Sequence, residues 1–153
     1  MKKYYLAHSC QLIEQARRWE IKIQGRYYVD LVNPFNRNTF ENVDHLKRLK
    51  TKRRLRAYMK TLDDEICKQI VDHDLGLLRK CDGVVAYFND YTAGTMMEIF
   101  AGAYLYRIPV YVIGGGAIYH PWLQHLVQIS GGMRFKTRRE FEQWLEEQGL
   151  RRK

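Results

Sequence analysis

The chain has 153 residues, of which 46% are hydrophobic, so we expect a single domain over 1–153 with a substantial buried core. It holds no run of about 18 apolar residues, which excludes a transmembrane helix, and its start lacks the apolar stretch of a signal peptide. Its three cysteines are widely spaced and include no C-x-x-C pair, which argues against a disulfide framework and against a zinc site. We therefore expect a cytoplasmic protein with reduced thiols and no membrane partner.

The net charge of +9 comes largely from one basic segment. Eight cationic side chains lie there with no acidic residue between them: Lys47, Arg48, Lys50, Lys52, Arg53, Arg54, Arg56 and Lys60. Such a patch attracts phosphate groups, or it is a solvated helix face or mobile loop. Interleaved aromatic residues would favour single-stranded nucleic acid, but the patch contains Tyr58 alone. Nucleic acid is therefore the less favoured partner.

Strand-like and helix-like segments alternate along the chain, which predicts a parallel sheet covered by helices on both faces. In chain order we expect a strand at 3–7, a helix at 10–24, a strand at 26–32, a basic excursion at 35–61, a helix at 62–80, a strand at 83–88, a helix ending near 106, a strand at 109–113, a helix at 121–128, a strand at 133–136 and a helix at 138–148. The excursion is either irregular or a short helix. This order predicts an α/β fold, a flavodoxin-like doubly wound five-stranded parallel sheet that binds ligands at the carboxyl ends of its strands.

Local signals refine the helices. Gly25 is expected to end the first helix, and Thr137 with Glu140 predicts a capping box for the last helix, which Gly149 ends. The helical period gives the first helix these core contacts: Ile13, Ala16, Trp19, Ile21 and Ile23.

Asp74 is the first residue-level indication of a functional site. The helical period places five apolar residues on one face of the helix at 62–80: Cys67, Ile70, Val71, Leu77 and Leu78. Asp74 falls in the middle of this face. Because an unpaired buried carboxylate is costly, Asp74 must be paired or must line a cavity.

Polar residues gather at the loops that follow the predicted strands. The expected set is His8, Ser9, Asn33, Asp90, Thr92, Gly94, Thr95 and Glu98, with Gly114–Gly116 after the fourth strand. Asp74 approaches from the preceding helix. The carboxyl ends of parallel strands meet at one edge of the sheet, so we expect these residues to converge there.

The order of these residues resembles the nucleoside 2-deoxyribosyltransferase family, which includes the 2′-deoxynucleoside 5′-monophosphate N-glycosidases. The resemblance covers Tyr4–Ala7 with its following loop, Asp74–Tyr87, Gly94–Ala103 and Arg107–Ile113. The basic excursion and the C-terminal tail lie outside it. Its most specific element begins at Asp74, ends at Glu98 and has the pattern D-x7-D-G-V-V-A-x7-G-T-x-x-E.

The resemblance implies that the chain cleaves the N-glycosidic bond of a nucleoside or nucleotide, by deoxyribosyl transfer to another base or by hydrolysis. Glu98 would be the nucleophile that attacks C1′ of the sugar, and Asp74 would contact the substrate near the base and help the base to leave. No metal or organic cofactor is implied. The resemblance also implies a homo-oligomer whose neighbouring subunit completes or covers the site, with the small residues at 99–106 as a close-packing surface.

Three of the site residues have a structural alternative. Glu98 stands three residues after Thr95, so it is either a nucleophile kept ionised by the helix dipole or the acid of a capping box. Ser9 is either a helix N-cap or a phosphate or sugar contact. His8 is either a general base or an incidental loop residue.

Thr92 departs from the resembling pattern. Six residues before the nucleophile, the transferases carry an acidic residue that serves the base, and the monophosphate hydrolases carry a serine that holds the 5′-phosphate. The hydroxyl of Thr92 and the basic segment favour a phosphorylated substrate.

Two other functions compete with this one. A non-catalytic nucleotide or nucleic-acid binder would use the basic segment and would not need both carboxylates in one cleft. A cytokinin-activating phosphoribosyl hydrolase shares the glycine–threonine–glutamate turn but carries a P-G-G run before it, which residues 89–93 lack.

Overall fold

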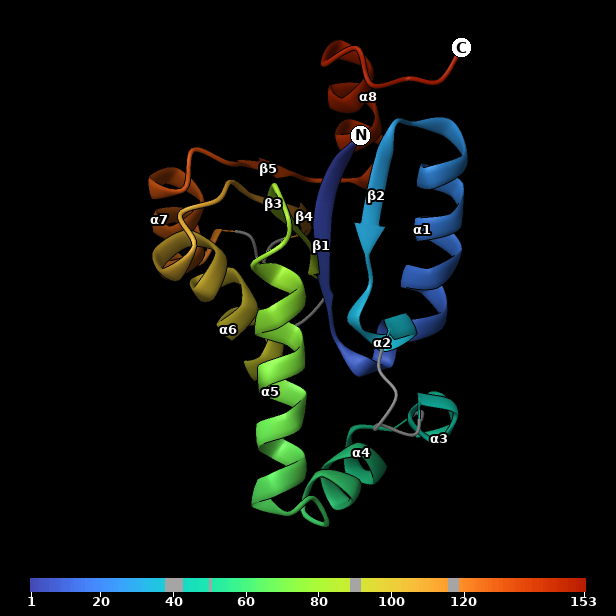
Figure 1. Cartoon of the computed structure of the whole chain (residues 1–153), viewed down its shortest axis with the longest axis vertical. Helices are drawn as coiled ribbons and strands as arrows, with labels where there is room; N and C mark the ends of the chain where they lie inside the picture. Colours follow the sequence, from blue (N-terminus) through green and yellow to red (C-terminus); the bar gives the residue numbers. More distant parts are fainter. Residues whose placement is uncertain (38–42, 50, 89–91, 116–118) are drawn as a thin grey trace.

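A computed structural model describes residues 1–37, 43–49, 51–88, 92–115 and 119–153. Its centre is a five-stranded sheet in the order β2-β1-β3-β4-β5, with every neighbouring pair parallel (Figure 1). The strands are β1 (Lys2–His8), β2 (Val29–Val32), β3 (Gly83–Phe88), β4 (Val110–Gly114) and β5 (Met133–Phe135). This confirms the predicted flavodoxin-like α/β fold.

One face of the sheet packs against α1 (Ile13–Arg26) and α8 (Arg138–Glu147). A 3₁₀ turn, η1 (Cys10–Leu12), precedes α1. Alternate strand residues such as Leu6 and Val85 meet Trp19 and Phe141 in this layer. The start of α8 is capped as expected, because the Glu140 amide donates to Thr137 Oγ1 at 3.2 Å.

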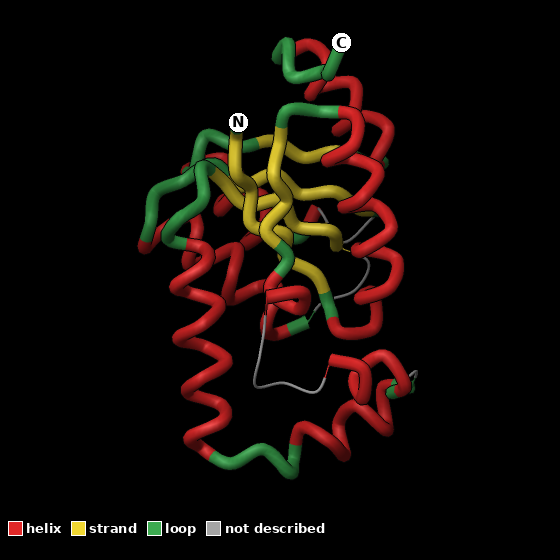
Figure 2. The backbone as a smooth tube through the Cα atoms, turned by 45° about the vertical axis from the view of Figure 1, so that its right-hand side comes forward, coloured by secondary structure: helices red, strands yellow, loops and turns green. Residues whose placement is uncertain are grey.

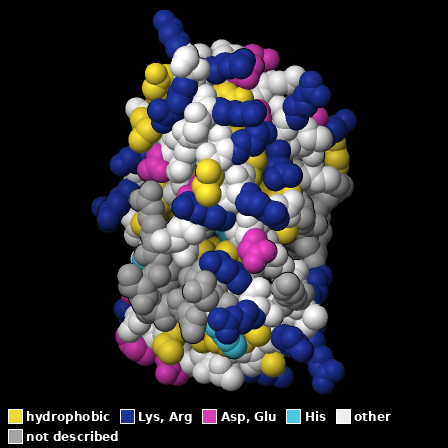
Figure 3. Space-filling model, turned by 90° about the vertical axis from the view of Figure 1, so that its right-hand side faces the viewer, with side chains coloured by type: hydrophobic (Ala, Val, Ile, Leu, Met, Phe, Trp, Pro, Cys, Tyr) yellow, Lys and Arg dark blue, Asp and Glu magenta, His cyan; other side chains and the backbone are white. Residues whose placement is uncertain are grey.

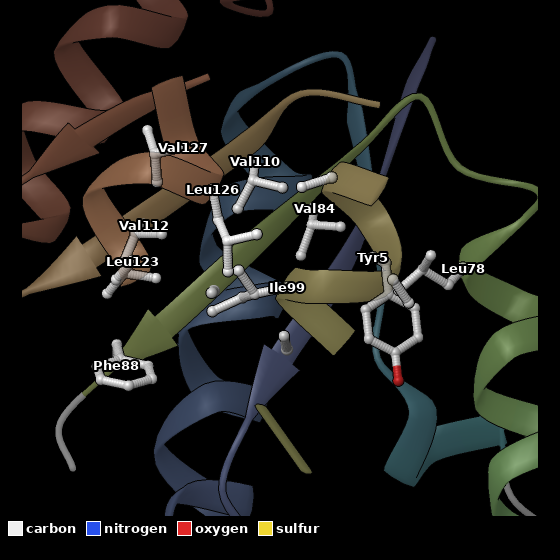
Figure 4. Packing of buried hydrophobic residues seen from close by; sticks show 14 of the residues in the cluster. Tyr5, Leu78, Val84, Phe88, Ile99, Val110, Val112, Leu123, Leu126 and Val127 are labelled. Carbon is white, nitrogen blue, oxygen red and sulfur yellow. The ribbon is translucent and has the colours of Figure 1, made fainter. Parts of the chain in front are cut away.

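The other face packs against four helical segments. They are α5 (Asp64–Leu78), α6 (Ala93–Phe100), the π-helical segment η2 (Ala101–Leu105) and α7 (Pro121–Ile129). Figure 4 shows Ile99, Leu123 and Leu126 interleaved with strand residues of this layer. Both faces of the sheet are therefore covered, which explains why the central strands are apolar throughout.

Between β2 and α5, the described residues form three short helices: α2 (Pro34–Arg37), α3 (Val43–Arg48) and α4 (Lys52–Met59). Figures 1 and 2 show α3 and α4 beyond the carboxyl ends of β1 and β2, apart from the body of the domain. We call α3 and α4 the arm. Leu46 of α3 is buried, and α3 contacts η1, so the arm rests on the turn that follows β1.

Several local expectations were wrong at the edges of elements. Gly25 does not end the first helix, which continues to Arg26 with Tyr27 as its C-cap. Ile21 is 56% exposed rather than a core contact. The second strand begins only at Val29, because Tyr27 instead forms an antiparallel bridge with Arg151.

The predicted core face of the helix at 62–80 was correct only near its C-terminal end. Leu78 is fully buried and Leu77 packs against the core, whereas Cys67 and Val71 are exposed. The reason is geometric: the first turns of α5 extend past the edge of the sheet toward the arm (Figure 1), where no core exists to cover them. Ile70 faces the arm from this extension.

The small residues after Ile99 pack inward, not toward a neighbouring subunit. Ala101, Gly102 and Ala103 are buried against the sheet. A Cβ on Gly102 would lie 2.6 Å from Val84 Cγ2, so the segment η2 approaches β3 as closely as glycine permits. These three small residues therefore cannot provide the close-packing surface expected at 99–106, whereas Tyr104 and Leu105 of the same segment are exposed.

Candidate functional site

A cavity of about 740 Å³ lies at the carboxyl edge of the sheet. The chain passes from β1 outward to β2 and then returns to β3 on the other side of β1. Loops that leave β1 and β3 therefore diverge, and doubly wound sheets bind ligands in the crevice that this reversal opens. The cavity is walled by residues after β1, β2 and β3, by α5 and by the arm.

Most of the predicted site residues line this one cavity. They are His8, Ser9, Asp74, Thr92, Gly94, Thr95 and Glu98. Asn33 is buried beneath the cavity wall and does not line it. Asp90 and Gly116 lie outside the described residues, and Gly114 and Gly115 are absent from the cavity's described lining.

Glu98 reaches the cavity from α6, and Tyr5 holds its carboxyl group. The Tyr5 hydroxyl donates a hydrogen bond to Glu98 Oε1 at 2.6 Å. Figure 4 shows the Tyr5 ring beside Leu78 with its hydroxyl pointing away from the labelled apolar side chains. The other oxygen, Glu98 Oε2, is buried and has no hydrogen-bond partner among the described residues. The carboxyl group is thus fixed through one oxygen, while the other has unused hydrogen-bonding capacity among the described residues.

Burial raises the pKa of Glu98 to about 8. The Tyr5 hydrogen bond opposes this shift, and the nearby Asp74 charge adds to it. The expectation that the helix dipole keeps Glu98 ionised was wrong, because desolvation outweighs any dipole effect at this depth. At neutral pH Glu98 is therefore mainly the neutral acid.

Glu98 is not the acid of a capping box. The helix α6 begins at Ala93 with Thr92 as its N-cap residue, so Glu98 is the sixth helical residue rather than the third. Thr92 Oγ1 donates to Thr95 Oγ1 at 2.8 Å, and neither hydroxyl is paired with Glu98. The structural alternative for Glu98 is therefore excluded by the position of the helix start.

Asp74 lines the same cavity from α5. Burial raises the pKa of this carboxyl, and the neighbouring His73 opposes the shift. His73 Nδ1 lies 3.2 Å from Asp74 Oδ1. The two carboxyl groups interact electrostatically, since the Asp74 charge raises the pKa of Glu98. Asp74 is both paired and at a cavity, as its place among apolar residues required.

A buried polar network supports the wall beside β1. His8 Nε2 lies 3.2 Å from Asn33 Oδ1, and its Nδ1 lies 3.0 Å from the Ser9 carbonyl oxygen. Asn33 also donates to Glu20 Oε2 at 3.0 Å and accepts from the Phe35 amide at 3.2 Å. Burial lowers the pKa of His8. His8 is thus an anchored, mainly neutral residue rather than an incidental one, and Asn33 supports the site through His8 and through the backbone of Phe35.

The arm contributes a cationic wall. Lys52, Arg56 and Lys60 line the cavity, together with Leu55 and Met59. These positions recur at intervals of three and four residues, which is one stripe along a helix. Residues 52–59 of the basic segment are therefore helical, and part of their cationic surface lines the cavity.

Sequence reasoning missed three kinds of contributor. Tyr5 was treated as a strand residue, although a hydroxyl within an otherwise apolar central strand needs a buried partner. Phe35 and Ile70 gave no signal, since apolar lining residues resemble core residues. The four-residue spacing of Lys52, Arg56 and Lys60 is visible in the sequence and places these three residues on one side of a helix.

Two negative findings concern the described part of the chain. None of its helices combines the length and apolar character that crossing a bilayer requires. Within the same residues, no three His, Cys, Asp or Glu side chains are grouped so that they can hold a metal ion.

Comparison with solved structures finds similarity to a 2-deoxyribosyltransferase from the psychrotolerant bacterium Bacillus psychrosaccharolyticus. The TM-score is 0.61 and the sequence identity is 17%, over 92% of this chain and 90% of that chain. No protein-family model matches the chain, and no curated protein sequence does so either. At this identity the likeness shows that the two chains share a fold.

Proposed function

We propose that the protein cleaves the N-glycosidic bond of a deoxynucleoside or its 5′-monophosphate through a covalent intermediate on Glu98. The observation that carries this proposal is the geometry of Glu98 in the cavity. One oxygen is fixed by Tyr5 at 2.6 Å, while the other is buried without a partner among the described residues. A buried polar atom without a hydrogen bond is costly, and such atoms are retained where they have a catalytic role.

In the first step, ionised Glu98 attacks C1′ of the sugar through Oε2. The C1′–Oε2 bond forms as the bond between C1′ and the base nitrogen breaks, and that electron pair leaves with the base. Asp74 supplies the proton that the departing base needs, and its raised pKa suits it to hold that proton. Carboxylate attack on an anomeric carbon is the chemistry of retaining glycosidases.

In the second step, a water molecule or a second base attacks C1′ from the face that the first base left. The C1′–Oε2 bond breaks, the electron pair returns to Glu98, and Asp74 accepts the proton of the incoming group. Water gives hydrolysis, and a base gives deoxyribosyl transfer. Tyr5 stabilises the carboxylate released at the end, since its hydrogen bond favours the charged form of Glu98.

A non-catalytic nucleotide or nucleic-acid binder is the competing function. It would use the basic wall but has no need of two interacting carboxyl groups facing it. Both Asp74 and Glu98 line the cavity that the arm closes. A site that only binds a phosphate-bearing ligand gains nothing from a carboxyl group held at a raised pKa with one oxygen unpaired among the described residues. The carboxyl groups therefore favour catalysis.

A base-release assay tests the proposal. Purified protein is incubated with the four common deoxynucleosides and their 5′-monophosphates, and free base is followed by chromatography. We expect base from at least one substrate, at a rate that rises with pH toward 8, because Glu98 must ionise before it attacks. Adding a second base separates transfer from hydrolysis, since only transfer yields a new nucleoside. Absence of base release from all eight substrates would remove the proposed function.

A further inference from the structure

We propose that the cavity-facing stripe of the arm is a phosphate-binding site, and that the substrates are nucleoside 5′-phosphates rather than free nucleosides. This rests on the proposed function for the identity of the nucleoside part. The phosphate site is supported by the position of the cations of α4 and its C-cap at the cavity. Ligand-binding measurements test it without any assay of activity.

The basic residues of α4 and its C-cap form two sets, one that lines the cavity and one that does not. Lys52, Arg56 and Lys60 line the cavity, whereas Arg53 and Arg54 on the same helix do not. All three side chains are exposed and reach the cavity from one side of α4 and its C-cap. Cations gathered on one wall of a cavity create a positive potential inside it and attract anionic ligands.

The charges that line the cavity are complementary to a phosphate monoester. Among its described lining residues, three are cationic and two, Asp74 and Glu98, are acidic. Glu98 is mainly neutral at pH 7 because its pKa is about 8. The lining thus carries a net positive charge near +2, and a phosphate monoester carries roughly −1.5 to −2 at this pH. Arg56 adds a planar donor pair that can hold two phosphate oxygens at once.

The dimensions favour a mononucleotide over a polymer. A volume of about 740 Å³ lies in the range of roughly 300–1,000 Å³ that small-molecule sites occupy. The three cations and the two carboxyl groups line the same cavity, whereas proteins that follow a nucleic-acid backbone use a positively charged groove along its length. Figure 3 shows further Lys and Arg side chains spread over an outer face of the molecule, with few acidic ones among them. Binding to polyanions through that outer surface is therefore the effect to exclude.

A matched pair of double variants tests the site. One is Arg56→Gln with Lys60→Gln, which removes two charges from the inner stripe. The control is Arg53→Gln with Arg54→Gln, which removes two charges from the same helix but away from the cavity. Both are made in the Glu98→Gln background, so that ligand binds without turnover. The probes are the four deoxynucleosides, their 5′-monophosphates and inorganic phosphate, with affinities measured by titration calorimetry at low salt.

We expect the parent to bind a 5′-monophosphate at least about tenfold more tightly than the matching nucleoside. The inner double variant should lose this preference while its nucleoside affinity stays the same, and the control should keep it. Inorganic phosphate should compete with the monophosphate but not with the nucleoside. Equal affinity for both ligands in the parent, or equal loss in the two double variants, would overturn the phosphate site.

Two further outcomes keep this proposal separate from the proposed function. The first outcome concerns a short single-stranded oligonucleotide. If it binds more tightly than every mononucleotide, and if the control variant weakens its binding, the inference is overturned in favour of nucleic-acid binding. A protein that shows the monophosphate preference but releases no base would retain the phosphate site and lose the glycosidic activity. Circular dichroism of each variant checks the fold, which should persist because α4 buries no side chain.

Discussion

Burial and hydrogen bonding have opposite effects on the pKa of Glu98. Burial favours the neutral acid and raises its pKa to about 8, while the Tyr5 hydroxyl favours the anion. A substrate that leaves positive charge at C1′ in the transition state shifts this balance toward the anion, because the opposite charge then lies beside the carboxylate. The ionised form of Glu98 is thus stabilised most in the transition state.

Replacement of Glu98 by Gln separates chemistry from structure. Gln is nearly isosteric with the neutral acid and can still accept the Tyr5 hydrogen bond, so at pH 5 the free energy of unfolding should change by less than about 1 kcal/mol. Turnover should fall by several orders of magnitude, since an amide does not attack C1′ at useful rates. Denaturant melts and base-release assays on both proteins measure the two quantities. Retained turnover in Glu98→Gln would show that Glu98 is not the nucleophile.

The raised pKa of Glu98 also predicts how stability depends on pH. The pKa is about 8 in the folded protein against an ordinary value of 4.5, so between these values the folded state binds one proton more than the unfolded state. The stabilising contribution is fully present below pH 4.5 and is lost as the pH rises toward 8, by up to about 1.4 kcal/mol per pH unit.

Urea unfolding of wild type and Glu98→Gln at several pH values between 5 and 8 isolates this contribution. The variant lacks the titrating group, so its advantage over wild type should grow as the pH rises. All other groups titrate in both proteins and cancel in the difference. A difference that stays constant across this range would mean that the pKa of Glu98 is not raised.

At the level of single residues, the sequence indicated the chemistry but not the local geometry. Thr95 and Glu98 have the spacing of a capping box, yet Thr92 begins the helix three residues earlier and takes the N-cap position. Helix starts are ambiguous in a run such as Thr92–Thr95, because two residues in it can serve as a cap. Tyr5 could not be paired with Glu98 from the sequence, since 93 positions separate them.

Gly102 lets η2 approach β3 closely on the α6 side of the sheet. Replacing Gly102 by Ala would place a Cβ 2.6 Å from Val84 Cγ2, so the side chain or the backbone must shift. Overpacking of this kind typically costs about 1–3 kcal/mol. We therefore expect Gly102→Ala to lower the free energy of unfolding by that amount, measured by urea denaturation.

Gly76→Ala is the matched control for this variant. Gly76 also lies within a helix, α5, but a Cβ there meets no atom within 4 Å. The substitution should stabilise the protein by roughly 0.5–1 kcal/mol through helix propensity alone. Gly102→Ala as stabilising as Gly76→Ala would show that η2 does not pack tightly on β3.

Helices were predicted well where they lie on the sheet and poorly where they leave it. The helical period identifies a core face only if a core covers the whole helix, and the first turns of α5 extend beyond it, which leaves Val71 exposed. The arm was harder still. Its helix α4 buries no residue, so the sequence shows no apolar period there. The place of the arm depends on tertiary contacts, such as the burial of Leu46 in α3.

For the whole molecule, the order of strands and helices along the chain was enough to predict the fold. Uninterrupted apolar strands such as Gly83–Phe88 fit only a sheet covered on both faces, and parallel strands then bring their following loops to one edge. The convergence of Asp74 and Glu98 follows from this topology. The cationic wall does not, because the distance between the arm and the sheet edge depends on tertiary packing and not on any local pattern.

The surface of α6, η2 and α7 carries exposed apolar side chains that a single copy leaves uncovered. Met97, Tyr104 and Leu105 lie on one side of the α6–η2 helix, and Leu105 is 61% exposed. The Tyr104 hydroxyl lies 3.3 Å from His125 Nε2, so α7 continues this surface, with Trp122 62% exposed. Adjacent exposed apolar residues of this kind mark interaction surfaces.

We predict that this surface joins copies of the chain into a homo-oligomer. This exposed apolar surface, and not the buried small residues of η2, is the basis for the predicted oligomer. Part of the surface lies on α6, the helix that carries Glu98, so a neighbouring copy would lie close to the cavity. Sedimentation velocity should give a mass above the 18.3 kDa of one chain, and Leu105→Asp should shift the protein toward monomer by placing a charge in the interface. Ile21→Asp is the control, because Ile21 is 56% exposed on α1, across the sheet from this surface. Wild-type protein that remains a monomer at high concentration, or equal dissociation by both substitutions, would contradict the assignment of the interface to α6, η2 and α7.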